Sequence, residues 1–411
     1  MAISEKFYLG RQPILDRRQE IVGYELLFRS AGLDYAEFDS YSHASASVIT
    51  NALAAFGIQE VLGGKLGFIN VHLGLLLSEM LELLPIEQSV LELLEIIKID
   101  EKVVERCREL KQLGFRLALD DHEYNPECVG IYEHVDIIKI DILQVDAGML
   151  PGIVEELRQW PIKILAEKVE TVEQFETCFR MGFDLFQGYF FERPVVLNKK
   201  RIDVSGMAML KLLQQLARNA AIEEIEETFK ANPSMSYTLL RLVNSVAIGA
   251  RAKIKTLRHA ITMLGIDHIR RWIQLSLFAG NDSRGINNPL LEMAAVRGRL
   301  MEILVMQKER DHVISEKSEE AFMTGILSLL EVLFETPMSE IVESLNLTDE
   351  VSNALLSRTG DLGQLLSLAE RLEVTDFDAV TPLLEQSEIS LDQLLAAQLD
   401  AFNWRVSVMA R

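Results

Sequence analysis

The feature of this sequence that most constrains its fold is an alternation between short apolar runs and longer segments of helical periodicity in the first 198 residues. Candidate strands, rich in β-branched residues, are 22–28, 66–71, 90–94, 115–119, 137–140, 162–166 and 185–186. The segments 42–56, 102–113, 153–160 and 172–181 have the apolar spacing of helices. Strands that alternate with helices in this way predict a parallel α/β architecture, and their number favours a small (β/α) barrel over an open sheet.

After about residue 200 the strand signal ends and helical patterns follow. Asn232-Pro233 has the form of a helix start before 235–244, Thr256 precedes a helix over 257–264 that Gly265 ends, and a further helix is expected from Asp267 to about 278. We therefore expect an α/β plus all-α protein. Residues 1–198 form the barrel domain and residues 199–411 form the helical domain.

The charge of the chain limits its partners. It has 41 Lys and Arg against 62 Asp and Glu, a formal net charge of −21, and no run rich in Lys or Arg. Binding to nucleic acid or to an anionic membrane depends on clustered cationic charge, so neither is expected as a partner. Residues 1–13 lack the layout of a signal peptide, and no apolar stretch approaches the roughly 18 residues of a membrane span. We expect a cytoplasmic protein.

The three cysteines, Cys107, Cys128 and Cys178, form no CxxC spacing, so we expect packing residues in a reducing compartment.

Polar residues stand at the ends of nearly all the predicted strands. They are Asn70, Glu92, Glu95, Asp120, Asp121, Lys139, Asp141, Glu167, Glu170 and Gln187, and the first strand contains Glu25 and Arg29. Functional groups of a parallel barrel lie at the carboxyl ends of its strands, so we expect these side chains to converge on one mouth. A single Asp or Glu after a strand is often only a helix cap or a solvated residue. We keep that interpretation for Glu95, Asp141 and Glu170.

Several carboxylates in one cleft repel one another, and a cation between them relieves that cost. Mg²⁺ or Mn²⁺ suits these oxygen ligands. The adjacent pair Asp120-Asp121 can hold two ions roughly 3.5 to 4 Å apart, the geometry of two-metal phosphoester hydrolysis. Lys139 can then position or activate the attacking water, and Arg29 can face a phosphate.

With these residues, positions 1–198 resemble the EAL family of cyclic di-GMP phosphodiesterases. The family's motif, Glu-Ala-Leu followed by any residue and Arg, is matched by Glu25-Leu26-Leu27-Phe28-Arg29. The resemblance implies two divalent ions, Mg²⁺ or Mn²⁺. It makes Glu25, Asn70, Glu92 and Asp120 ligands of one ion and assigns Asp120 and Asp121 to the second. It places Lys139, Glu167 and Gln187 around the attacking water, Arg29 at the substrate, and Glu95 at the anchor of a lid loop.

The sequence departs from the family pattern at three places. Leu26 replaces the alanine of the motif, and Leu94 replaces the usual threonine before Glu95. The loop that reads Asp-Asp-Phe-Gly-Thr-Gly in the family here continues from the aspartates as His122-Glu123-Tyr124-Asn125, without either glycine. Glycine permits backbone conformations that other residues resist. In the family this loop supports metal binding and communication across a homodimer, so its change bears on both.

The second half, from about 200 to 390, resembles the HDOD family, a helical relative of the HD phosphohydrolases without their metal site. The resemblance is carried by Asn232-Pro233, by the segment 239–245 and by the segment 254–265. Leu327-Ser328-Leu329 stands where an active HD enzyme has Leu-His-Asp. We expect His259 and His268 to be helix-surface or packing residues. The domain order resembles that of the YuxH-like two-domain signalling proteins.

Two hypotheses follow from the residues and the resemblance. The first is a bacterial signalling enzyme, a metal-dependent phosphodiesterase that hydrolyses cyclic di-GMP to linear pGpG, with the HDOD half as a regulatory module that binds an unknown signalling protein. The second is a catalytically silent EAL-like receptor or scaffold that acts through protein–protein interaction. The retained carboxylates favour the enzyme, and the changed 122–125 loop favours the receptor.

Overall fold

A computed structural model describes residues 7–30, 61–122, 124–189, 204–232, 235–236, 239, 257–280, 289–309, 315–334, 336–345 and 347–409. The helix expected at 42–56 and most of the helix expected at 235–244 lie outside these residues. The chain forms two compact units: Met1–Arg193 together with Leu368–Arg411, and Pro194–Ser367.

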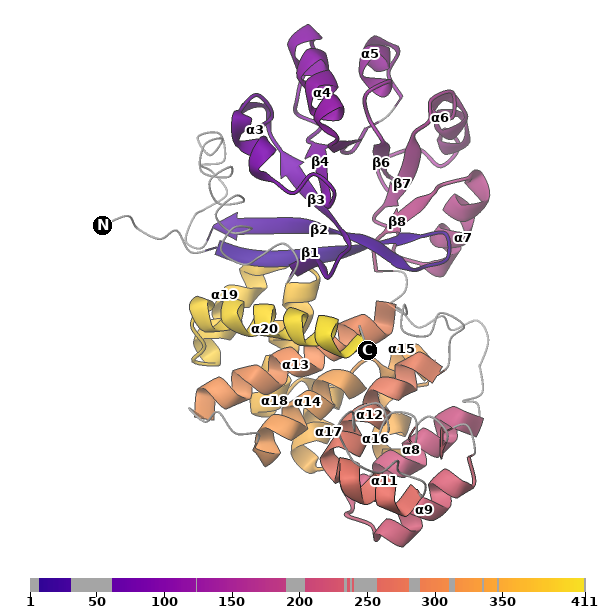
Figure 1. Ribbon diagram of the computed structural model, residues 1–411, viewed down its shortest axis with the longest axis vertical. Coiled ribbons are helices and arrows are strands. Elements are labelled where there is room, and N and C mark those ends of the chain that lie inside the picture. Colours follow the sequence, from indigo (N-terminus) through magenta and orange to yellow (C-terminus); the bar gives the residue numbers. More distant parts are fainter. Residues whose placement is uncertain are drawn as a thin grey trace, which may run out of the picture. The chain divides into compact units, whose positions relative to one another are not determined.

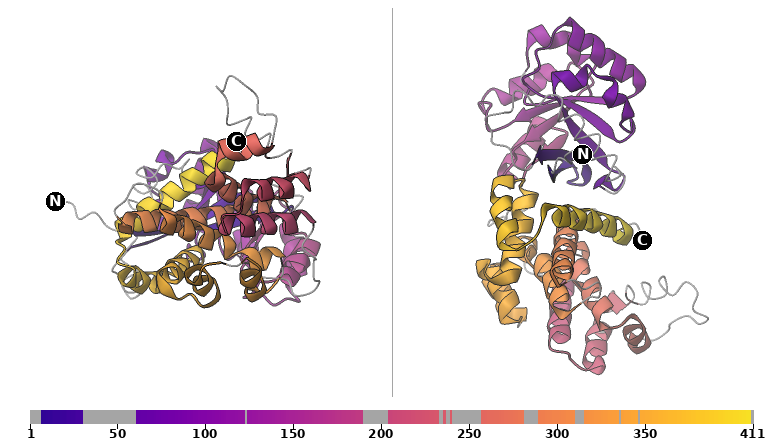
Figure 2. Two further views of the ribbon diagram at one scale, coloured as in Figure 1. Left: turned by 90° about the horizontal axis from the view of Figure 1, so that it is seen from below. Right: turned by 90° about the vertical axis from the view of Figure 1, so that its left-hand side faces the viewer.

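The first unit contains a closed eight-stranded barrel (Figures 1 and 2). Its strands follow one another around the barrel in chain order: β1 (Phe7–Asp16), β2 (Ile21–Ser30), β3 (Leu66–Val71), β4 (Ser89–Leu93), β5 (Arg116–Leu119), β6 (Ile137–Asp141), β7 (Lys163–Glu167) and β8 (Leu185–Gln187). The seven strands predicted from the sequence are β2 to β8. Their predicted limits differ from the observed ones by at most two residues.

The barrel predicted from the sequence is confirmed, but strand β1 was not expected, and it departs from the parallel arrangement of the other strands. It pairs antiparallel with both β2 and β8. The cause is the short connection to β2, in which Gln19 adopts a φ of 59° and Oδ1 of Asp16 accepts hydrogen bonds from the backbone N–H groups of Arg18 and Glu20. Two strands joined by so tight a turn must run antiparallel, because a parallel pair needs a long crossover.

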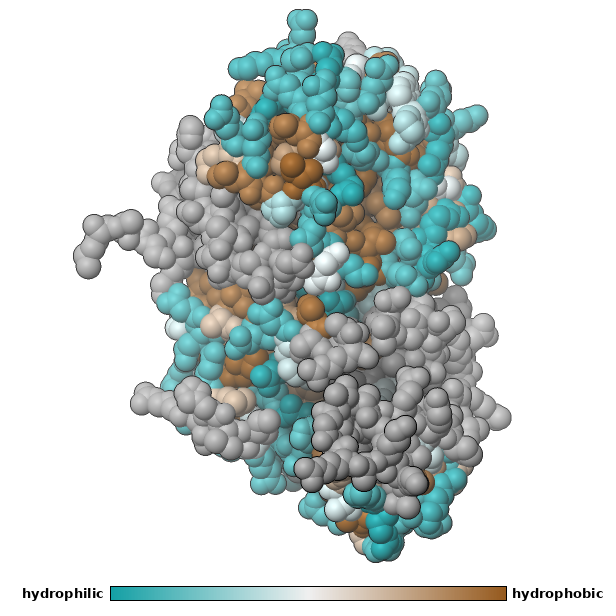
Figure 3. All heavy atoms as spheres, viewed as in Figure 1, coloured by the Kyte–Doolittle hydropathy of each residue, from teal (hydrophilic) through white to brown (hydrophobic). Residues whose placement is uncertain are grey.

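Helices on the outside of the barrel connect the parallel strands. They are α3 (Leu73–Leu76), the 3₁₀ helix η2 (Glu79–Leu83), α4 (Glu101–Leu113), the 3₁₀ helix η3 (Pro126–Cys128), α5 (Val129–Tyr132), α6 (Leu150–Leu157) and α7 (Val172–Met181). Helix α4 begins after the N-cap Asp100, ends at Gly114 in the left-handed conformation, and buries Val103, Cys107 and Leu110. Its opposite face is exposed, in keeping with the mostly hydrophilic surface over these helices in Figure 3.

The barrel interior is filled by a layer of apolar side chains, one from each strand except β2. The layer consists of Ile14, Phe68, Val90, Ala118, Ile137, Leu165 and Leu185, with Val22 and Leu66 packed against it. At β2 the inward position is Gly23, where a Cβ atom would lie 3.0 Å from Cε2 of Phe68. This layer is the floor on which the polar residues of the next layer stand.

Two further helices complete the first unit, α19 (Phe377–Gln386) and α20 (Leu391–Met409). Gln398 of α20 donates a hydrogen bond to the carbonyl oxygen of Leu9 at 3.2 Å, and the guanidinium of Arg11 lies 3.9 Å from the ring centroid of Phe402. From the sequence we expected these helices in the helical domain. They pack instead with the barrel strands β1 and β2.

The second unit is helical, as expected. It contains α8 (Val204–Ala217), α9 (Ile222–Lys230), α11 (Leu257–Leu264), α12 (Ile266–Gly280), α13 (Pro289–Glu309), α14 (Glu316–Leu327), α15 (Leu330–Phe334), α16 (Met338–Leu345), α17 (Asp349–Ser357) and the first part of α18 (Gly360–Glu373). Gly265 separates α11 from α12, as the sequence indicated. Among the described residues of the whole chain, none of the helices has the length and apolar character needed to cross a membrane.

Candidate metal and phosphodiester site

The polar residues at the strand ends form a second layer directly above the apolar one. Each lies two residues beyond an apolar-layer residue: Asn70, Glu92, Asp120, Lys139, Glu167 and Gln187 follow Phe68, Val90, Ala118, Ile137, Leu165 and Leu185. Side chains of a strand point to the same face at every second residue, so the polar set points inward like the apolar set. In β1, which runs the other way, the corresponding residue Gln12 precedes Ile14.

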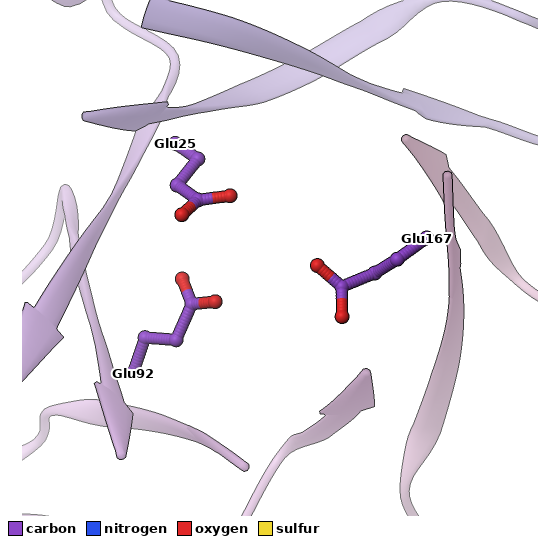
Figure 4. Close-up of side chains that lie close together, drawn as sticks. All are labelled: Glu25, Glu92 and Glu167. Carbon is purple, nitrogen blue, oxygen red and sulfur yellow. The ribbon is translucent and has the colours of Figure 1, made fainter. Parts of the chain in front are cut away.

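Three buried glutamates face one another across this layer. Glu25 of β2, Glu92 of β4 and Glu167 of β7 point toward a common centre in Figure 4, and one carboxylate oxygen of each lies within 4.8 Å of the others. A second set of oxygens from Asp120, Asp121 and Glu167 meets the same limit. The barrel therefore brings together two overlapping groups of three carboxylates.

Lys139 stands among these carboxylates and is only 1% exposed. Its Nζ atom lies 2.8 Å from Oε1 of Glu167, 2.9 Å from Oδ1 of Asp120 and 3.3 Å from Oε2 of Glu25, and it also contacts Glu92. Burial acts to lower the pKa of Lys139, but the surrounding carboxylates outweigh burial and raise this pKa well above its usual range. The lysine is therefore a fixed positive charge at the centre of the site.

Two buried carboxyl groups of the site hold protons more strongly than usual. Burial raises the pKa of Glu92 well above its ordinary range, although Lys139 opposes the shift. Burial likewise raises the pKa of Glu167 to about 8, again against the effect of Lys139. One lysine therefore does not compensate all the negative charge that would collect here if every carboxyl group were ionised.

Amide side chains orient Glu25 from two sides. Nδ2 of Asn70 donates to Oε1 of Glu25 at 3.0 Å, and Nε2 of Gln187 donates to Oε2 of Glu25 at 2.6 Å and to Oε1 of Gln12 at 2.8 Å. Several buried oxygens of the site have no hydrogen-bond partner among the described residues: Asn70 Oδ1, Glu92 Oε2, Asp121 Oδ1, Glu167 Oε2 and Gln187 Oε1. Buried oxygens left in this way are costly unless a cation or a ligand takes them up.

Two residues of the site have left-handed backbone conformations. Asp121 has a φ of 41° and Lys168 a φ of 55°, and each directly follows an inward-pointing residue at the end of a strand. Such angles are uncommon outside glycine and are concentrated at functional sites.

Asp141 is held by structural contacts. Lys168 contacts its carboxylate, which also accepts hydrogen bonds from the backbone N–H of Leu143 and from the side chain of Gln144. This agrees with the structural interpretation of Asp141.

A cavity of about 230 Å³ opens over the site. Its lining residues are Gln12, Glu25, Leu27, Asp120, Asp121, Lys139, Glu167, Lys168 and Gln187. Gln12 and Lys168 were missed in the sequence analysis. The spacing of Gln12 from Ile14 could have revealed the first, had β1 been recognised as a strand, and the position of Lys168 directly after Glu167 could have indicated the second.

Arg29, predicted at the substrate, is not among the residues that line this cavity. Nη2 of its guanidinium lies 2.5 Å from Oδ1 of Asp378 in helix α19. Arg29, the residue predicted to bind a phosphate of the substrate, is therefore in an ion pair with the C-terminal part of the same unit.

The loop that lacks the family's glycines is held by an aromatic residue. The hydroxyl of Tyr132 lies 2.9 Å from Nε2 of His122, accepts a hydrogen bond from the backbone N–H of Asn125 at 2.9 Å and donates one to its carbonyl oxygen at 3.2 Å. The ring of Tyr132 packs edge-on against Trp160, with 4.9 Å between the centroids. Burial lowers the pKa of His122 to about 4, so this histidine is neutral at physiological pH.

The remaining predicted residues lie away from the cavity. Glu95 is exposed, and the backbone N–H of Glu170 donates to the side chain of Gln174 at the start of α7. His259 and His268 are exposed on α11 and α12, as expected. Cys107 and Cys178 are buried and Cys128 is partly buried, and none of these three residues forms a disulfide.

In the second unit the segment 327–329, which stands where an active HD enzyme has Leu-His-Asp, is packed in the helical core. Leu327 is 1% and Leu329 4% exposed. Between them, the buried hydroxyl of Ser328 accepts a hydrogen bond from Nη1 of Arg297 at 2.6 Å.

The chain matches two known domain families and is similar to known proteins along nearly its whole length. Residues 73–194 match the EAL domain family, and residues 206–346 match the HDOD domain family. The chain is 30% identical to the uncharacterised protein YuxH of Bacillus subtilis over 412 aligned residues, which cover 98% of this chain and 99% of YuxH. It is 29% identical to the cyclic di-GMP phosphodiesterase CdgJ of Vibrio cholerae, over 97% of this chain and 92% of that protein.

Among solved structures, a manganese and cyclic di-GMP complex of Klebsiella pneumoniae BlrP1 is similar at 19% identity and a TM-score of 0.37, over 46% of this chain and 56% of that one.

Proposed function

Because this chain belongs to the family of proteins in which an EAL domain is followed by an HDOD domain, we propose that it is a metal-dependent phosphodiesterase that hydrolyses cyclic di-GMP to linear pGpG. The full-length similarity to the phosphodiesterase CdgJ supports the substrate. The observation that carries the reaction is the convergence of Glu25, Glu92 and Glu167 on one point at the carboxyl end of the barrel.

The residues of the site fit divalent cations. The donors are carboxylate and amide oxygens, which Mg²⁺ and Mn²⁺ prefer, and five of these oxygens are buried without a partner among the described residues. We assign Glu25, Asn70, Glu92 and Asp120 to one ion, and Asp120 and Asp121 to a second. When bound, such ions supply an activated water and offset the negative charge that develops on the phosphoryl group.

The chain's own residues carry the other roles. In the net reaction water adds to phosphorus, one P–O bond of the ring breaks, and the leaving sugar oxygen takes a proton. Glu167, whose carboxylate lies beside Asp120 and Asp121 and whose Oε2 has no hydrogen-bond partner among the described residues, is suited to accept a proton from the water. Lys139 orients Glu167 by its 2.8 Å contact, and Gln187 orients Glu25. Arg29 binds a phosphate of the substrate.

One observation favours the second candidate function, a receptor without turnover. Lys139 contacts four carboxylates of the site, so the protein itself supplies a cation where metal ions would otherwise be needed. The loop after Asp121, which is tied to Tyr132, is likewise a departure from the family pattern. In either case we propose that the helical region binds a signalling protein and that the chain forms homodimers.

The test is formation of linear pGpG by purified protein in Mg²⁺ and in Mn²⁺. Glu25→Ala removes a central carboxylate, and the matched control Glu155→Ala removes an exposed carboxylate on α6. Product from the wild type and from Glu155→Ala, but not from Glu25→Ala, is the expected result. Binding of cyclic di-GMP without product would make the protein a receptor. The absence of both product and binding would overturn both candidates.

A further inference from the structure

The C-terminal segment 373–381, which joins α18 to the first turn of α19, lies beside the strands that carry the site. It contacts strand β1, strand β2 and the residues that follow β8, all within one compact unit. These contacts come from residues more than 180 positions away in the sequence. Their positions relative to the cavity show what the segment does.

Strand pairing fixes the face on which the contacts occur. In the antiparallel pair of β1 and β2, Gln12 lies opposite Glu25, Gly10 opposite Leu27, and Tyr8 opposite Arg29. Gln12, Glu25 and Leu27 line the cavity. Because every second residue of a strand points to the same face, the contacting residues continue the cavity-lining face outward, with Arg29 about 7 Å beyond Leu27.

The C-terminal segment covers this continuation closely. A Cβ atom on Gly10 would lie 2.6 Å from Cγ2 of Thr375 and 3.0 Å from Cζ of Phe377, so only glycine leaves room for the segment. The ring of Tyr8 stacks on Phe377 with 5.4 Å between the centroids. The hydroxyl of Tyr8 makes a 2.8 Å hydrogen bond with Oγ1 of Thr381. This packing makes the segment a fixed wall.

The same wall reaches the next strand of the barrel. Strand β8 pairs with β1 through Gln187 and Ile14, and Tyr189 follows Gln187 by two residues. The hydroxyl of Tyr189 donates to the carbonyl oxygen of Glu373 at 3.4 Å. The segment therefore borders the mouth of the barrel along β8, β1 and β2.

Asp378 is the charged residue of this wall that forms an ion pair with Arg29, the residue predicted to bind a substrate phosphate. Its side chain is 67% exposed and that of Arg29 is 27% exposed, so solvent and ligands can reach the pair. The hydrogen bond from Arg29 lowers the pKa of Asp378, which keeps the carboxylate charged at neutral pH. A carboxylate and a phosphodiester are both anionic hydrogen-bond acceptors for a guanidinium.

We infer that the segment 373–381 forms one wall of the substrate entrance, and that Asp378 sets substrate affinity by competing with a substrate phosphate for Arg29. This inference rests on the proposed function. An exposed ion pair is weak enough for a ligand phosphate to displace it.

The test measures cyclic di-GMP affinity and, where product forms, KM and kcat of the full chain. Asp378→Asn removes the competing charge, and Glu385→Gln removes an exposed carboxylate from the same helix as the matched control. We expect Asp378→Asn to lower the Kd and KM about two- to fivefold with kcat unchanged, and Glu385→Gln to leave all three as in the wild type. In an Arg29→Gln background, Asp378→Asn should have no effect.

The outcomes separate this inference from the proposed function. Wild-type binding with an unchanged or weaker affinity in Asp378→Asn overturns the competition while leaving the function intact. A gain that persists without Arg29 also overturns it, since general charge repulsion would then be the cause. No binding by either protein overturns both. Binding by Asp378→Asn alone supports both and makes Asp378 the residue that closes the entrance.

Discussion

The Nζ atom of Lys139 lies 2.8 Å from Oε1 of Glu167, inside a barrel where both side chains are almost fully buried. The lysine comes from β6 and the glutamate from β7, so the pair depends on adjacent strands in register. It joins a cation to a group that we propose as a proton acceptor. In the absence of bound metal, Lys139 is also the charge that keeps the neighbouring carboxylates together.

Replacement of Lys139 by methionine should therefore destabilise the metal-free protein. The change leaves buried carboxylates without their cation, and breaking a buried pair in this way costs about 3 to 5 kcal/mol. We expect that loss in urea unfolding with EDTA, and partial recovery when Mn²⁺ is added. The control Lys102→Met alters an exposed lysine of α4 and should change the unfolding free energy by less than about 0.5 kcal/mol. Equal stability of Lys139→Met and wild type in EDTA would contradict this role.

Replacement of Glu92 by glutamine should separate metal binding from structural stability. Burial already raises the pKa of Glu92, and glutamine has the shape of the protonated acid and keeps an oxygen for Lys139. We expect the free energy of unfolding in EDTA to differ from that of the wild type by less than about 1 kcal/mol. We expect Mn²⁺ to raise the Tm of the wild type but not that of the variant, because a ligand stabilises only the state that binds it. A full Mn²⁺ shift in the variant would argue against Glu92 as a ligand.

Gly188→Ala should disrupt the end of β8. Gly188 has a φ of 143°, and a Cβ atom there would lie 2.1 Å from the carbonyl oxygen of Val169. The backbone must move, so we expect a loss of about 3 kcal/mol or more in unfolding free energy. Gly152→Ala is the matched control, since it lies in helix α6 with open space around its Cβ position and should stabilise the protein by about 0.5 to 1 kcal/mol. Similar unfolding curves for the two variants would contradict the expectation.

The cysteines should differ in their reactivity toward a thiol reagent. Burial raises the pKa of Cys107 to about 12 and that of Cys178 to about 11, so both stay protonated in the folded protein at pH 8. We expect the partly buried Cys128 to react first in the native protein and all three to react in denaturant. Folding raises the pKa of both buried thiols. Their contribution to the free energy of unfolding is therefore fully present below about pH 9 and is lost as the pH rises further. Rapid native labelling of a Cys128→Ser variant at pH 8 would contradict the expectation.

Much of the barrel could be predicted because its information is local. Strands such as 66–71 and 137–141 are apolar runs with β-branched residues, and the ends of α4 and α7 are marked by capping residues. The inward direction of Glu92 and Lys139 follows from the two-residue period of a strand. Strand β1 was missed because Gly10 and Pro13 interrupt the strand pattern in this segment.

The sequence by itself determined which groups stand at each strand end, and therefore that carboxylates and one lysine would meet in a barrel. Tertiary structure alone decided that Lys139 lies among four of those carboxylates, that β1 closes the barrel antiparallel to its neighbours, and that residues 368–411 pack with the first unit. It also decided that Arg29 pairs with Asp378, 349 residues away in the chain. The physical reason is that periodicity and capping act within a few residues, whereas these contacts depend on how distant segments pack, which no local pattern records.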